Sequence, residues 1–174
     1  VEAYTCLADE VQAAHDRVDP ADLPGRWAAL AESMRAWALA NPHEWALLFG
    51  SPVPTYHAPS DQTTDPGTRV PRLLMAIGRD AARRGLTGSA PFGPPPLADH
   101  LAGATAANLL GEAELTSAGM TAVTLTNGLV AWTMLVGAIS SEVFQQLGPD
   151  SIADPEAFFS YQVAMTQALL FERG

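Results

Sequence analysis

Apolar residues recur at intervals of three and four positions along most of this chain, which is the spacing of one face of an α-helix. The run from Trp27 through Leu30 and Met34 to Trp37 shows this spacing clearly. No segment shows the two-residue alternation of a half-buried β-strand. We therefore predict an all-α domain, a helical bundle of six to seven helices. The expected helices cover residues 2–18, 21–40, 42–49, 66–84, 97–110, 117–147 and 155–172.

Prolines mark where several of these helices are expected to begin. A proline in the first helical turn follows an Asp or Asn whose side chain can cap the free backbone N–H groups. Glu44, three residues after Asn41, extends one of these pairs into a capping box. Segments rich in proline or glycine at 51–64 and 86–96 are expected to be irregular. The four pairs are Asp19–Pro20, Asn41–Pro42, Asp65–Pro66 and Asp154–Pro155.

The two helices expected at the end of the chain are apolar on more than one side. Such a pattern indicates burial on more than one side, which in a chain of modest length favours a partner, most simply a second copy. In the first of the two helices, apolar positions follow a 4-3-4-3-4 spacing like that of a coiled-coil seam. We therefore predict a homodimer that uses these helices. The expected interface residues are Leu125, Leu129, Val136, Ile139 and Val143, with Phe158, Tyr161, Met165 and Leu169.

The charge of the chain limits its own partners. Among 174 residues it has a net charge of −10 and only nine Lys and Arg. Nucleic-acid binding needs clustered positive charge, so the chain is not expected to bind DNA by itself. Its apolar stretch at 128–139 is shorter than the ~20 residues that span a bilayer, so no membrane contact is expected. The single cysteine, Cys6, excludes a disulfide framework and fits a cytoplasmic location.

A small metal-dependent enzyme is the alternative reading of the histidines. His43, Glu44 and His57 have side chains of the types that bind zinc or iron. The helical zinc motif H-E-x-x-H needs a second His four positions on, and Leu47 stands there. No Ser or Cys nucleophile motif and no glycine-rich phosphate loop accompanies these residues. We therefore expect a protein that is not an enzyme and has no cofactor, with the metal site as the alternative.

A ligand cavity is the other candidate site. Pockets for small molecules are mostly apolar, with a few polar groups that orient the ligand. Several large, adaptable apolar residues fall on different predicted helices, with rare amides close to them in the pattern. The expected pocket residues are Met34, Trp37, Phe49, Met75, Asn108, Asn127 and Trp132.

Two stretches of the sequence resemble a known family. The segments "RAWALANPHEWALLFGSPVPTYHAP" at 35–59 and "GLVAWTMLVGAISSEVFQQLG" at 128–148 are similar to the C-terminal half of TetR-type transcriptional regulators. Trp132, Gly137 and Glu142 stand where the WHG-type group of this family has its Trp, its Gly and an acidic residue. Val136 departs from that signature, which often has His before the glycine. The resemblance covers essentially the whole chain.

The resemblance implies a homodimeric DNA-binding regulator, usually a repressor released by a small apolar effector. It also implies that the last two long helices of each subunit form a four-helix bundle at the dimer interface. Residues 1–174 then form the regulatory domain, which binds the effector and dimerises. Operator DNA is bound through an N-terminal helix-turn-helix domain of about fifty residues, which we expect to be absent from this chain. The first helix corresponds to the family's connection between the two domains. An effector that moves this helix changes the spacing of the DNA-reading heads.

Overall fold

The structure is a computed structural model that describes residues 2–50, 60–86, 88 and 119–172. Within these residues the chain forms six α-helices and no strand, which confirms the all-α prediction. The helix expected at 97–110, and Asn108 with it, lies outside the described residues. The helices are α1 (Glu2–His15), α2 (Leu23–Ala40), α3 (Pro42–Phe49), α4 (Ser60–Arg83), α8 (Ala122–Val143) and α9 (Pro155–Phe171).

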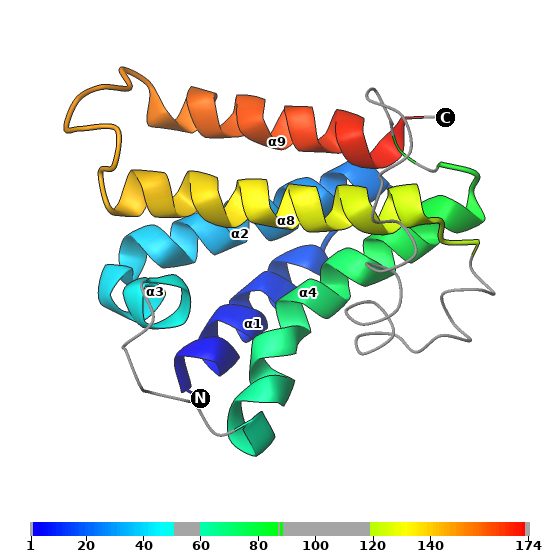
Figure 1. Ribbon diagram of the computed structural model, residues 1–174, viewed down its shortest axis with the longest axis horizontal. Helices are drawn as coiled ribbons and strands as arrows, with labels where there is room; N and C mark the ends of the chain where they lie inside the picture. Colours follow the sequence, from blue (N-terminus) through cyan, green and yellow to red (C-terminus); the bar gives the residue numbers. More distant parts are fainter. Residues whose placement is uncertain (1, 51–59, 87, 89–118, 173–174) are drawn as a thin grey trace.

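The helices pack in two groups (Figure 1). α8 and α9 run antiparallel, side by side, with α2 passing behind α8, and both contact α2. α1 and α4 lie together below them in this view, and α1 also packs on α2. The N-terminus is on the side of the molecule away from α9. One face of the α8–α9 pair therefore has none of the six described helices against it.

Buried tryptophans link the helices of the core. Trp27 of α2 is fully buried, and its Nε1 donates a hydrogen bond to Oγ1 of Thr166 in α9 at 2.8 Å. Trp45 of α3 is also fully buried and donates from Nε1 to Oγ of Ser140 in α8 at 3.1 Å. Because each indole N–H has a partner, both rings can be buried without an unsatisfied donor.

α9 and α3 begin at the predicted prolines, Pro155 and Pro42, but α2 does not begin at Pro20, and Asn41 does not cap α3 with its side chain. Asp154 caps α9 by accepting a hydrogen bond from the N–H of Ala157. α2 is capped by Asp22, with Pro24 in its first turn, so Asp19 is not the cap that we predicted. Asn41 makes no side-chain cap to α3, because its amide donates to the carbonyl of Trp37 at the end of α2. The predicted capping box is therefore wrong.

Two other helices have different ends from those predicted. α4 begins at Ser60, so the Asp65–Pro66 pair lies inside it rather than before it. Its apolar face packs on α1, α2 and α8, and this packing outweighs the loss of backbone hydrogen bonds at proline. α8 is shorter than predicted at both ends, with Thr121 accepting from the N–H of Thr124 at its start and Phe144 at its end. The residues buried on α4 are Val70, Leu74, Met75, Ile77 and Ala81.

The apolar part of α8 is longer than the stretch 128–139 considered from the sequence. Its residues Val123–Val143 form a helix long and apolar enough to cross a membrane by length and composition alone. The core helix of a soluble protein passes the same test, and α8 packs against α2, α3, α4 and α9. The continuous apolar character is the pattern of a helix buried on several sides.

Candidate dimer interface and ligand cavity

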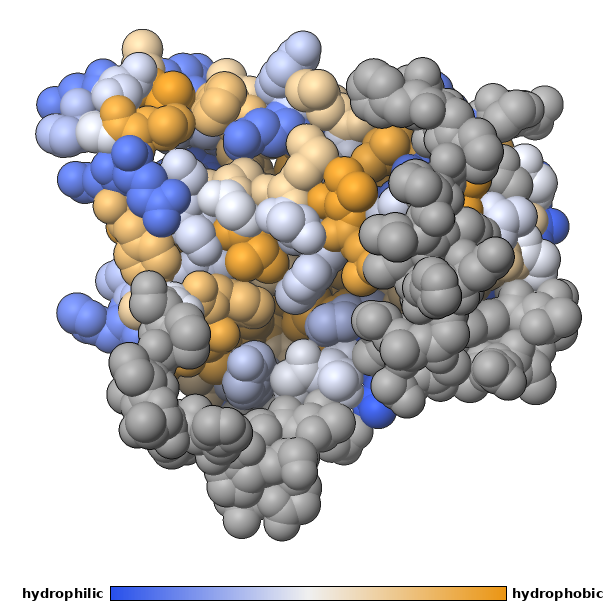
Figure 2. Space-filling view, in the orientation of Figure 1, coloured by the Kyte–Doolittle hydropathy of each residue, from blue (hydrophilic) through white to orange (hydrophobic). Residues whose placement is uncertain are grey.

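The side of α8 and α9 that no described helix covers carries large exposed apolar residues. α2 passes behind α8 in Figure 1, so these free faces are turned to the viewer, and Figure 2 shows apolar residues gathered over both helices there. Tyr161 is 65% and Met165 50% exposed, which is unusual for apolar side chains in the middle of a helix. Large exposed patches of this kind mark interaction sites. We call this surface the α8–α9 face; it comprises Val130, Met134, Phe144, Phe158, Tyr161 and Met165.

The structure corrects the α8 side of the predicted interface. Leu125 is 5% exposed and Ile139 fully buried inside the chain, so neither can contact a partner directly. Val136 and Val143 are half-buried and pack against the same core. The 4-3-4-3-4 seam therefore faces the chain's own helices, and the α8–α9 face is a different stripe of α8. Leu129 is half-buried.

On α9, the exposed residues agree better with the predicted interface. Phe158, Tyr161 and Met165 are all exposed, while Leu169 is half-buried. The core side of the same helix holds Phe159, Val163 and Leu170. That these exposed residues contact a second copy of the chain remains a prediction.

An ion pair joins α2 to the last turn of α8. The guanidinium of Arg35 donates from Nε to Glu142 Oε2 at 2.7 Å and from its Nη2 to Oε1 at 2.6 Å. Both side chains are about four-fifths buried, and the Arg35 guanidinium lies 5.2 Å from the centre of the Phe159 ring. The hydrogen bonds that Arg35 donates to Glu142 raise the pKa of Arg35 above its ordinary value, although burial opposes this. The acidic residue of the family signature therefore has a structural partner.

We expect a double-mutant cycle on this pair to give a coupling free energy of about 1–2 kcal/mol. A bidentate, partly buried ion pair contributes more to stability than an exposed one. The variants are Arg35→Ala, Glu142→Ala and the double variant, with stability measured by urea unfolding. A matched cycle on Arg69 and Asp9, joined by one contact at 2.8 Å and more exposed, should give less. Equal coupling in the two cycles would contradict the assignment.

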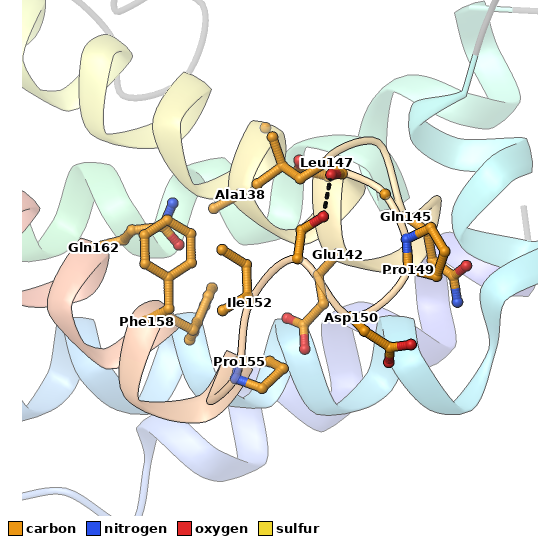
Figure 3. Close-up of a pocket in the computed structure, with 15 residues that line it drawn as sticks. Ala138, Glu142, Gln145, Leu147, Pro149, Asp150, Ile152, Pro155, Phe158 and Gln162 are labelled. Carbon is orange, nitrogen blue, oxygen red and sulfur yellow. Dashed lines mark hydrogen bonds between the residues drawn. The ribbon is translucent and has the colours of Figure 1, made fainter.

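A cavity of about 530 Å³ lies at the hairpin between α8 and α9. We call it the hairpin cavity; Figure 3 shows residues of its wall coming from the end of α8, the connection 144–154 and the first turns of α9. A hollow of about 20 Å³, big enough for one water molecule, adjoins it and shares Ala138, Phe159 and Gln162. Sequence reasoning did not find this cavity, because its wall depends on the path of the connection.

The predicted pocket residues lie elsewhere. Met34, Trp37 and Met75 are buried within the helical core. Phe49 and Trp132 are half-buried and meet edge to face, with ring centres 6.2 Å apart. Of the predicted residues that the structure describes, none lines the hairpin cavity or the hollow beside it.

Asn127 has a structural role that the sequence did not reveal. Its Nδ2 donates to the carbonyl of Leu169 at 3.0 Å and so ties α8 to the end of α9. Gly88 lies against the same place, with its N–H donating to the carbonyl of Glu172. A Cβ on Gly88 would come within 2.6 Å of Nδ2 of Asn127, and the φ of +80° also favours glycine there. The amide therefore serves as a connection between helices.

The alternative metal site falls partly outside the described residues. His43 and Glu44 are exposed on α3, and His57 is among the residues that the structure does not describe. In the described part of the chain, no group of three His, Cys, Asp or Glu side chains is placed to hold a metal ion. The structure thus adds no support for the enzyme alternative.

Comparisons with known proteins agree with the all-helical architecture. A family profile described as "Tetracyclin repressor-like, C-terminal domain" matches residues 27–166. The HTH-type transcriptional regulator Rv1816 of Mycobacterium tuberculosis is 36% identical over 173 residues, which are 99% of this chain and 70% of that protein. The regulator Mb1846 of Mycobacterium bovis gives the same figures.

A solved structure agrees as well. The crystal structure of SCO4313, provisionally described as a regulatory protein, is 29% identical and has a TM-score of 0.65, covering 95% of this chain and 68% of that one. This chain belongs to the family of TetR-type transcriptional regulators and matches their C-terminal domain. The resemblance found in the sequence is thereby confirmed. Its relatives are regulators of transcription.

Proposed function

We propose that this chain is the effector-binding and dimerisation domain of a DNA-binding transcriptional repressor, and that it forms a homodimer through the α8–α9 face. The observation that supports dimerisation most directly is the row of exposed apolar side chains on two adjacent helices. Burying Tyr161 and Met165 against a second copy removes apolar surface from water. The antiparallel pair from each subunit would then form a four-helix bundle.

Sedimentation equilibrium tests this proposal on the unmodified chain. We expect a mass of twice the chain's 18.3 kDa at micromolar concentration, because interfaces of this helical type bury large apolar areas. A single species of 18.3 kDa throughout the micromolar range would contradict the proposed dimer.

We place the effector in the bundle near Trp37, Phe49, Met75 and Trp132. The half-buried edge-to-face pair of Phe49 and Trp132 and the adaptable side chain of Met75 suit an apolar ligand. Binding there would reduce operator affinity only if the two binding events are coupled. A ligand that binds the folded chain should raise its unfolding temperature, which a thermal-shift screen of apolar compounds would measure.

Operator DNA would be bound through an N-terminal helix-turn-helix domain rather than through residues 1–174. The net charge of −10 supports this division, because phosphate contacts need positive side chains. A regulator of this kind acts in the cytoplasm, and we propose no membrane partner and no enzymatic activity for it.

A further inference from the structure

The hairpin cavity has the dimensions of a binding site for a small molecule. Its volume of about 530 Å³ falls within the roughly 300–1,000 Å³ typical of ligand pockets. Leu147 and Ile152 from the connection face it together with Phe158 and Phe159 from α9. These side chains form an apolar wall against which the body of a ligand can pack.

Hydrogen bonds within the connection, and from the connection to α8, fix the path of the cavity wall. Ser151 donates from Oγ to the carbonyl of Leu147, which Figure 3 shows as a dashed line. The N–H of Gln146 donates to the carbonyl of Ser141, and Gly148 takes a left-handed φ of 92°. Because these bonds are satisfied without a ligand, binding needs little ordering of the connection.

Several polar side chains of the wall have no partner in the described part of the chain. The side chains of Gln145, Asp150 and Gln162 line the cavity, the first two of them exposed, and none makes a hydrogen bond or ion pair with another described residue. Glu142 is different, since both of its carboxylate oxygens already accept hydrogen bonds from Arg35. The free acceptors are thus the Asp150 carboxylate and two amide oxygens.

The charges of the wall favour a cation. Two carboxylates, Glu142 and Asp150, line the cavity, and no Arg, Lys or His is among the described residues of its lining. The Arg35 charge is already matched by Glu142, which leaves Asp150 with its charge uncompensated. Asp154 and Glu156, at the adjacent start of α9, add to the negative potential. An anionic ligand would be repelled.

We propose that the hairpin cavity binds a small organic cation, a protonated amine attached to an aromatic ring or short apolar chain. The ammonium group would lie at Asp150 and the amide oxygen of Gln162, and the apolar body against Ile152 and Phe158. This site is separate from the effector site in the core, and it does not depend on the chain being a dimer. Since Phe158 also belongs to the α8–α9 face, an occupied cavity would alter the edge of that face.

Calorimetric titration with 2-phenylethylammonium chloride at low salt tests the proposal. Phenylacetate and 2-phenylethanol serve as anionic and neutral probes of similar size. We expect the ammonium probe to bind, the alcohol to bind more weakly, and phenylacetate to bind weakest. Added salt should weaken the binding of the cation, because the attraction to Asp150 is screened. No binding of the ammonium probe, or equal binding of all three, would overturn the proposal.

Variants localise the binding. Asp150→Asn keeps the shape of the wall and suits the φ of +60°, and we expect it to weaken binding of the ammonium probe about three- to fivefold. Glu10→Gln makes the same change of charge on exposed α1 and should leave the affinity unchanged. Ile152→Trp should fill the cavity and abolish binding while circular dichroism shows an intact helical fold. Equal affinity of all three variants would place the probe elsewhere and overturn the proposal.

The same titration distinguishes a ligand from a partner subunit. We expect the probe to bind the chain as it exists in solution and also a Met165→Glu variant designed to be monomeric. Binding to that variant alone would mean that the partner fills the cavity in the assembled protein, and this result would overturn the proposed site. A chain that binds the probe yet sediments as a monomer would contradict the proposed dimer and leave this site supported.

Discussion

A Met165→Glu variant is expected to sediment as a monomer at concentrations at which the unmodified chain is a dimer. Met165 lies on the α8–α9 face and is half exposed, so the change should not disturb the core of the subunit. In the dimer its carboxylate would be buried among apolar side chains without a positive partner, which costs several kcal/mol. We expect the dimer dissociation constant to rise by about 100-fold or more. Sedimentation velocity over a concentration series measures this change.

Ser160→Glu provides the matched control for this experiment. Ser160 is also exposed on α9, but it lies on the flank of the helix that carries Glu156 rather than among the apolar residues. The variant has the same added charge on the same helix, and we expect it to remain a dimer. If both variants stay dimeric, or both dissociate equally, the α8–α9 face is not the interface.

A Trp27→Ala variant is expected to lose about 3–5 kcal/mol of unfolding free energy. The side chain of Trp27 is fully buried between helices, so its removal leaves a large cavity in addition to the lost transfer free energy. It also removes the hydrogen bond to Thr166, which joins α2 to α9 across 139 positions of sequence. Since single domains are stable by only about 5–15 kcal/mol, the variant should be close to unfolding. Urea unfolding followed by circular dichroism, at one fixed protein concentration, measures the loss.

Two further variants separate packing from hydrogen bonding at this position. Trp27→Phe keeps most of the ring but loses the Nε1 donor, and we expect it to cost about 1–2 kcal/mol. Leu47→Ala changes a leucine that is 82% exposed and should alter stability by at most about 0.5 kcal/mol. A cost for Trp27→Ala as small as that for Leu47→Ala would contradict the assigned place of Trp27 in the core.

The two ends of α2 connect the core to both helices of the α8–α9 face. Trp27, near its start, is bonded to α9, and Arg35, near its end, is paired with the last turn of α8. α1 packs on α2, so a displacement of α1 would affect the contacts of both Trp27 and Arg35. This arrangement offers a physical path between the N-terminal side of the chain and the proposed interface, which the variants at Arg35 and Trp27 would probe.

Asp–Pro and Asn–Pro pairs predicted a helix cap correctly at Asp154 but not at Asn41. α9 begins at Pro155 as expected, and the carboxylate of Asp154 caps it by accepting the N–H of Ala157. At Asn41 the same type of pair predicted the start of α3 correctly but not its cap, because the Asn41 amide donates to the carbonyl of Trp37 one turn earlier. A side chain with two possible backbone partners can be assigned only when the positions of both are known.

The sequence by itself determined the all-helical class, the family, and the fact that α8 and α9 are apolar on more than one side. It could not determine which apolar stripe faces inward, because Ile139 and Met134 are both hydrophobic and both occur at helical spacing. Packing against α2, α3 and α4 decided this by burying Ile139 and leaving Met134 exposed. The hairpin cavity likewise depends on the path of the connection 144–154, which follows from hydrogen bonds between residues and not from their order alone.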